Sequence, residues 1–172
     1  MKKLIAALLC TILFLGLLPV AAEKAEPTVS GDYEYVLLED GTARITKYTG
    51  DAVTLEIAGE LDGHAVSSIG KSAFKPTGKL VDVTIPEGVT EIGEHAFSDC
   101  RFLTDISIPQ SVERIGDLGF CNCKRLTDLT IPGSVTEIGR DAFYMCRDLT
   151  LTVPEGSYAE QYAKENEIPY KQ

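Results

Sequence analysis

The sequence has 172 residues, a length that indicates one domain or at most two small ones. Its 16 Lys and Arg residues against 26 Asp and Glu residues give a formal net charge of −10, which argues against a nucleic-acid partner. Hydrophobic residues make up 44% of the chain, so it can bury a core and is not disordered by composition.

Residues 1–22 have the pattern of a signal peptide. Two lysines after Met1 precede an uncharged apolar run, Pro19 interrupts that run, and small residues lead up to Ala22. An uncleaved anchor is the alternative, but the run before Pro19 is short for a membrane-spanning helix, so we expect cleavage after Ala22. The mature protein is then secreted or extracellular, either free or associated with the cell surface, with no stable membrane insertion.

Residues 23–30 are expected to form a short flexible linker, and residues 31–52 a β-hairpin. Two segments rich in apolar and aromatic residues, 33–38 and 42–48, flank Asp40-Gly41. An Asp-Gly pair between such segments is a strong hairpin signal, because both residues accept the backbone conformation that a tight turn requires.

A 23-residue repeat organises residues 53–156. Its strand segment recurs as Leu80–Pro86, Leu103–Pro109 and Leu126–Pro132, and a Phe and a Cys recur at the same step in each unit. An irregular unit with a five-residue insertion at 60–64 precedes these three, and a truncated unit follows. One coil cannot bury its own apolar side chains, so the repeat predicts a right-handed solenoid of about five coils. It would be mainly β, with short helical or 3-10 turns.

Residues 157–172 are expected to close the solenoid with a short helical cap. Ser157 followed by Glu160 is a capping box, and Tyr162 lies on the apolar side of the turn that follows. The hairpin over 31–52 would cover the other end, because both ends of a solenoid expose apolar ladders. No sorting motif follows the helix, so we expect the mature protein to be free rather than tethered.

The string from Leu126 to Cys146 resembles the BspA-like leucine-rich repeat of bacterial surface proteins, and the resemblance covers about residues 53–155. It implies a curved solenoid, exported or displayed at the surface, that binds other proteins or host matrix. Two features depart from the family pattern. Many such proteins are longer and carry anchoring or carbohydrate-binding modules, and Gly119 replaces the Ala of the other units.

The sequence offers little for catalysis. His64 and His95 have no nucleophile at a recognisable spacing, and we expect both to be solvated surface residues. No Gly-rich phosphate loop and no zinc-binding Cys/His pattern is present. We therefore expect no enzymatic activity, no cofactor and no bound metal.

Four cysteines remain after signal cleavage. Cys100, Cys123 and Cys146 share one repeat position, so adjacent coils would place them about 5 Å apart, within reach of a disulfide. Thr77 occupies the same position in another unit, so the fold does not require a thiol there, and buried free thiols are favoured over bridges. Cys121 is expected to be more exposed, and a metal site at Cys121 and Cys123 has no partner ligands.

The outward positions of the repeated strand are the best candidates for a ligand site. They carry acidic or hydroxyl side chains: Thr54, Glu56, Asp82, Thr84, Asp105, Ser107, Asp128, Thr130 and Thr152. In leucine-rich repeat solenoids this strand face is the usual binding surface. The alternative is a solvated face that only keeps the protein soluble.

Asp82, Asp105 and Asp128 would stack one per coil, a like-charge ladder that is unfavourable unless it is compensated. Arg101 and Lys124, each four residues ahead of an aspartate, are expected to fold back and pair with Asp105 and Asp128. The rival hypothesis is that the ladder binds Ca²⁺, which takes six to eight oxygen ligands. One carboxylate per coil disfavours calcium.

These patterns together predict an exported, non-enzymatic and monomeric leucine-rich repeat module. Its expected partner is an extracellular or host protein, bound in the manner of an adhesin on extracellular matrix. A carbohydrate or cell-wall ligand-binding protein is the alternative. The absence of aromatic side chains from the strand face disfavours it, and an enzyme ranks last.

Overall fold

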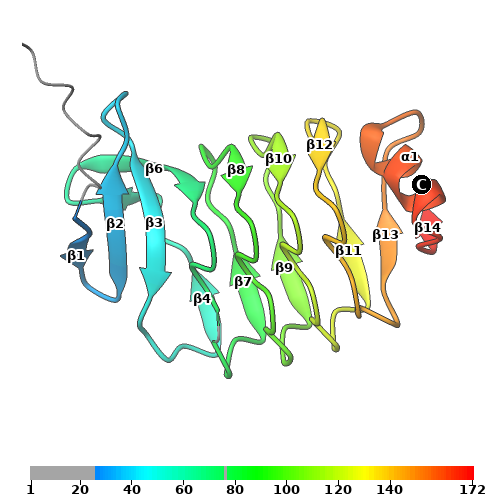
Figure 1. The fold of residues 1–172 in the computed structure, drawn as a ribbon, viewed down its shortest axis with the longest axis horizontal. Helices are drawn as coiled ribbons and strands as arrows, with labels where there is room; N and C mark the ends of the chain where they lie inside the picture. The colour runs from blue at the N-terminus through cyan, green and yellow to red at the C-terminus, as the bar shows by residue number, and fades with distance from the viewer. Residues whose placement is uncertain (1–25, 76) are drawn as a thin grey trace, which may run out of the picture.

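The structure, a computed structural model, describes residues 26–75 and 77–172. The expected signal peptide, residues 1–22, and the first part of the expected linker lie outside the described residues. Short strands stack side by side along one axis, with antiparallel strands at the N-terminal end and a helix at the C-terminal end (Figure 1). In the described part of the chain, no helix is long and apolar enough to cross a membrane.

Each regular coil contributes a first strand and a second strand, and strands of the same kind lie beside one another in successive coils (Figure 1). The first strands are β4 (Thr54–Glu56), β7 (Asp82–Thr84), β9 (Asp105–Ser107), β11 (Asp128–Thr130) and β13 (Thr150–Thr152). The second strands are β6 (His64–Ile69), β8 (Glu91–Ile92), β10 (Arg114–Ile115) and β12 (Glu137–Ile138). Hydrogen-bonded neighbours within each row are parallel, because the chain completes one turn between them.

The row of first strands is interrupted, whereas the row of second strands is continuous. β4, β7 and β9 form one three-stranded sheet, and β11 and β13 form another with β14 (Tyr170–Lys171). The second strands belong to one eight-stranded sheet that also includes the N-terminal strands. The solenoid that the 23-residue repeat predicted is confirmed.

The N-terminal β-hairpin is also present, and it forms part of the solenoid itself. β2 (Tyr33–Leu37) and β3 (Ala43–Tyr48) pair antiparallel, and β3 then pairs in parallel with β6. Because β3 takes the place of a second strand, the solenoid has about six turns, one more than expected. The repeat motif is missing from β3, so counting motifs does not find this turn.

Two segments that were expected to lack regular structure form strands. β1 (Thr28–Ser30), within the expected linker, pairs antiparallel with β2, because the edge of a hairpin offers backbone groups that an adjacent extended segment can satisfy. In the insertion, β5 (Glu60–Leu61) pairs antiparallel with the start of β6. Asp62 and Gly63 between them have φ values of 50° and 85°, the combination that a type I′ turn requires.

A continuous stack of aromatic rings runs through the core from one end of the solenoid to the other. Neighbouring ring centroids are 4.9 to 6.1 Å apart. The stack consists of Tyr33, Tyr48, Phe74, Phe97, Phe120, Phe143 and Tyr162. The middle rings are phenylalanines from the repeats, and the terminal rings are tyrosines from the two caps. The caps therefore extend the repeat's own packing while placing a polar atom at each end.

The C-terminal helix α1 (Tyr158–Glu165) closes the stack. Its N-cap, Ser157, accepts a hydrogen bond at Oγ from the Glu160 backbone N–H at 3.2 Å. The Glu160 carboxylate accepts from the Gly156 N–H at 2.7 Å, one residue before the partner that a capping box uses. Tyr162 Oη accepts from the Ala142 N–H at 3.2 Å, so this buried hydroxyl is satisfied. The predicted helical cap is present.

The recurring cysteines form a second internal ladder. Cys100, Cys123 and Cys146 donate from Sγ to the carbonyl oxygen of a phenylalanine in the preceding coil, at 3.5, 3.2 and 3.1 Å. Both Cys100 and Cys123 are fully buried, and Cys121 is half-buried. All four, including Cys121, are free thiols, in agreement with the interpretation from the sequence. Burial raises the pKa of the Cys100 thiol, which keeps it protonated and unreactive.

The aromatic stack predicts the cost of a core deletion. Phe97 is fully buried between two other rings, so Phe97→Ala is expected to lower the free energy of unfolding by about 3–5 kcal/mol. Phe102→Ala removes the same side chain at a position that is 44% exposed and is expected to cost less than about 1 kcal/mol. Denaturant unfolding measures both, and equal losses would contradict the stacked core.

The thiol ladder predicts the order of chemical labelling. In native protein a maleimide should modify Cys121 and Cys146 before Cys100 and Cys123, because the first two are half-buried and the other two are fully buried. In denatured, unreduced protein all four cysteines should be labelled, as intact mass spectrometry can count. A denatured protein that takes up label only after reduction would show that the ladder is bridged.

Candidate functional site

The candidate site on the first strands is an exposed surface of acidic and hydroxyl side chains. We call it the acidic face. Its inward residues, such as Leu55, Val83 and Ile106, are buried, and strand alternation therefore turns the intervening residues outward. All of the predicted positions are exposed except Thr152, which is half-buried. The acidic face consists of Thr54, Glu56, Asp82, Thr84, Asp105, Ser107, Asp128, Thr130 and Thr152.

Strand pairing brings most of these side chains together in register. On β7 and β9, Asp82 lies opposite Asp105, and Thr84 lies opposite Ser107. Thr54 and Glu56 of β4 extend the same register by one coil. Asp128, Thr130 and Thr152 belong to the other sheet, beyond the break between β9 and β11. The acidic face therefore has a continuous hydrogen-bonded part on β4, β7 and β9, and a second part on β11 and β13, which lies beside β9 without a hydrogen-bonded ladder between them.

The expected pairing of Arg101 and Lys124 with this face is wrong. Asp128 instead accepts a hydrogen bond from Lys171 Nζ at 2.8 Å, and this contact lowers the pKa of the Asp128 carboxyl. Arg101 Nη2 lies 3.4 Å from Asp99 Oδ1 instead of pairing with Asp105, because Arg101 and Asp99 belong to the same turn. Sequence spacing could not indicate Lys171, since it reaches Asp128 only through the pairing of β14 beside β13.

The continuous part of the acidic face has no internal counter-charge. Within residues 26–75 and 77–172, Glu56, Asp82 and Asp105 take part in no ion pair. In the same described ranges, no three His, Cys, Asp or Glu side chains are grouped so that they could hold a metal ion. The like-charge row is therefore left to solvent or to a partner.

The row of second strands carries charges too, but there they are compensated. Its outward positions place Arg44, Ser68, Glu91, Arg114 and Glu137 in register. Arg44 Nη2 lies 3.6 Å from Glu91 Oε2, and Arg114 Nε lies 3.1 Å from Glu137 Oε2. Arg44 Nε also donates to Ser68 Oγ at 2.8 Å. We call this surface the paired face, and its charges satisfy one another within the chain.

The two histidines contact different neighbours in different coils. His64 Nδ1 lies 2.9 Å from the Gly41 carbonyl oxygen, so it connects β6 to the N-terminal hairpin turn. His95 has a φ of 56° in a turn and lies 3.6 Å from Glu94. Both are half-buried, rather than fully solvated as expected, because neighbouring turns pack against them.

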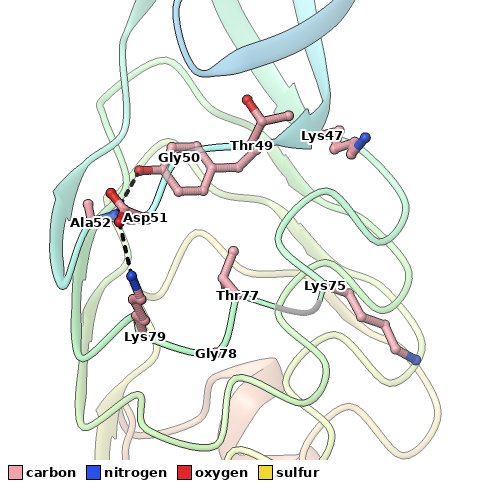
Figure 2. Close-up of a pocket in the computed structure, with 10 residues that line it drawn as sticks. Lys47, Thr49, Gly50, Asp51, Ala52, Lys75, Thr77, Gly78 and Lys79 are labelled. Atoms are coloured by element: carbon pink, nitrogen blue, oxygen red, sulfur yellow. Dashed lines mark hydrogen bonds and ion pairs between the residues drawn. The ribbon is translucent and has the colours of Figure 1, made fainter.

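A cavity of about 330 Å³ lies between the N-terminal cap and the first coils (Figure 2). Three lysines line it, which in an acidic protein would suggest an anion site. Lys79 Nζ, however, reaches across to Asp51 at 2.9 Å, as Figure 2 shows. Lys47 pairs with Glu34 at 3.1 Å and Lys75 with Asp99 at 3.6 Å. Each lysine is neutralised, so this cavity is a weaker candidate than the acidic face.

Sequence reasoning missed one further group of exposed residues. Phe102, Tyr144 and Met145 are large apolar side chains that remain 44 to 55% exposed on the turns that lead to the next first strand. The sequence does indicate that Phe102 is exposed, because the same repeat position holds the charged residues Lys79, Arg125 and Asp148 in the other units.

Neutralising the unpaired carboxylates of the acidic face and neutralising the paired Asp128 should have opposite effects on stability. Asp82→Asn with Asp105→Asn removes a like-charge contact and should raise the free energy of unfolding by about 0.2–1 kcal/mol at low salt. Asp128→Asn removes the contact with Lys171 and should lower it at neutral pH. Because Lys171 depresses the pKa of Asp128, that difference should disappear as the pH falls through the folded-state pKa.

Chemical denaturation at neutral and acid pH measures both variants. A double variant that is less stable than the wild type would show that the carboxylates of β7 and β9 have a structural role.

Comparison with known proteins agrees with this geometry. A family model described as BspA type leucine rich repeat region (6 copies) matches residues 61–166. A leucine-rich repeat protein from Bacteroides capillosus ATCC 29799 is 29% identical, with a TM-score of 0.67 over 74% of this chain and 98% of that one. The leucine rich repeat protein of T. pallidum is 28% identical, with a TM-score of 0.63 over 75% and 72%. No curated protein matches.

The family match covers more than half of the chain and includes every regular coil. It agrees with the 23-residue register, with the two rows of short parallel strands and with the stacked phenylalanines. This chain therefore belongs to the BspA-type leucine-rich repeat family.

Proposed function

We propose that the mature chain is an exported, non-enzymatic module that binds an extracellular or host protein through the acidic face, in the manner of an adhesin. Leucine-rich repeat proteins generally serve as protein-binding scaffolds. The observation that carries the proposal is the row of exposed carboxylates on β4, β7 and β9, which has no counter-charge in the described residues. Export is supported by the signal-peptide pattern of residues 1–22.

The chemistry of the face favours a partner that presents Lys and Arg side chains. Cations from the partner would relieve the repulsion between Asp82 and Asp105, and Thr84 and Ser107 offer hydroxyl groups for hydrogen bonds. The backbone ladder already holds these side chains in register, so little ordering is required on binding. After signal cleavage removes Lys2 and Lys3, the charge is −10 − 2 = −12. Such a negative charge increases the association rate of a basic partner. The affinity should therefore decrease as the salt concentration rises.

A carbohydrate or cell-wall ligand is the alternative. Sugar rings stack on exposed aromatic side chains, and the outward positions of the first strands carry none. The exposed aromatic residues of the described ranges, Phe102, Tyr144 and Tyr158, lie on turns or on α1. This distribution favours a protein partner for the acidic face.

The test uses two variants with the same change in net charge. Asp82→Asn with Asp105→Asn neutralises the acidic face, and Glu113→Gln with Glu167→Gln neutralises two exposed carboxylates elsewhere. Mature protein is used to capture extracellular and matrix proteins, and the affinity for the captured partner is measured at low and at physiological salt.

The acidic-face variant should bind about tenfold more weakly, equivalent to two exposed ion pairs of about 0.7 kcal/mol each. The control variant should bind as the wild type does. Equal weakening of both variants would contradict a role for the acidic face. Reproducible binding on a glycan array, with no protein captured, would favour the carbohydrate alternative.

A further inference from the structure

Basic and apolar side chains gather on the turns that follow the stacked phenylalanines of the last three regular coils. The Arg125 guanidinium lies 5.0 Å from the centre of the exposed Phe102 ring. A depression of about 280 Å³ beside them is lined by Lys124, Met145, Arg147 and Asp148. We call this the turn surface and define it as Phe102, Lys124, Arg125, Tyr144, Met145 and Arg147.

The core does not require the apolar members of the turn surface. Phe102 and Met145 are each 44% exposed, and Tyr144 is 55% exposed. The repeat position of Tyr144 holds Lys75, Ser98 or Cys121 in other coils. A ring or a thioether at such positions loses contact with water only if something covers it. The turn surface therefore has the composition of an interface rather than of packing.

The basic members of the turn surface are free within the chain. Among the residues that the structure describes, Lys124, Arg125 and Arg147 take part in no ion pair, although the protein is strongly acidic. Lysines on the earlier turns behave differently, because Lys75 pairs with Asp99 and Lys79 with Asp51. Asp148, which also lines the depression, takes part in no ion pair among the described residues, so with three cations against this one carboxylate the turns that expose apolar groups have a net positive charge.

We infer that the turn surface binds a short extended segment of a partner protein in which acidic and apolar side chains alternate. This site is separate from the acidic face and has the opposite charge. Arginine, aromatic residues and methionine are enriched where protein interfaces derive their binding energy. The first and third of three successive coils are separated by two spacings of about 4.8 Å, about 10 Å in all, which corresponds to roughly three to four residues of extended chain.

A polyanionic glycan is the competing ligand, since it would satisfy the three cations. It would leave Phe102, Tyr144 and Met145 without apolar contacts, although Phe102 lies against Arg125 and Met145 lines the depression with Lys124 and Arg147. A peptide with both acidic and apolar side chains can contact the cations and the apolar groups of the turn surface together.

The probe is a fluorescent peptide that alternates Asp or Glu with Phe or Leu, and its binding to the mature chain is followed by anisotropy. A peptide of Glu alone and heparin serve as competitors that offer charge without apolar groups. Lys124→Gln with Arg147→Gln tests the charge, and Phe102→Ser tests the apolar contact. Lys71→Gln with Arg140→Gln removes two cations away from the turn surface and is the matched control.

We expect saturable binding that weakens at least tenfold in the Lys124 and Arg147 variant and at least threefold in Phe102→Ser, while the control variant binds as the wild type does. The Asp82→Asn and Asp105→Asn variant should also bind normally, so this result is independent of the proposed function. No saturable binding would overturn the inference. So would a Phe102→Ser variant of unchanged affinity together with heparin as the better competitor, because that pattern indicates a glycan site.

Discussion

Every feature of this protein depends on one constraint, which is that a single 23-residue coil cannot bury its own apolar side chains. Stacking solves this by placing each Phe against the Phe of the next coil, with centroids 4.9 to 5.6 Å apart in the repeats. At each end of the solenoid, the last ring of the aromatic stack is a tyrosine from the cap. Tyr162 at one end and Tyr33 at the other pack a ring on the core and place the hydroxyl within hydrogen-bonding distance of a backbone N–H.

The same stacking fixes the outward side chains in rows, and the rows differ in how their charges are satisfied. On the paired face, Arg44, Glu91, Arg114 and Glu137 alternate in sign and compensate one another. On the continuous part of the acidic face, and among the basic residues of the turn surface, charges of one sign stand without ion-pair partners in the described residues. Like charges in register oppose folding, so the fold alone does not account for these rows, and our two proposals assign each of them to a partner. The rigid ladder presents both surfaces without a large ordering cost.

The sequence predicts most of the core and much less of the surface. The spacing of Phe97, Phe120 and Phe143 is sufficient to predict the solenoid, because burial depends on a short period along the chain. The sixth turn was missed because β3 keeps only the Ile of the repeat, as Ile45 opposite Ile69, and has Tyr48 rather than Phe in the aromatic stack. The partner of Asp128 was missed because Lys171 is 43 residues away. The acidic residues were correctly placed outward, but which of them would be paired depended on contacts that spacing does not encode.

Chemical footprinting of carboxylates with a captured protein partner tests the central claim, that the partner covers the face whose charges are uncompensated. A carbodiimide labels exposed Asp and Glu side chains, and mass spectrometry gives the labelling rate of each one with and without the partner. The account predicts that labelling of Glu56, Asp82 and Asp105 slows in the complex, while labelling of Glu91 and Glu137 is unchanged. Slower labelling of Glu91 and Glu137, with Asp82 and Asp105 unaffected, would contradict it.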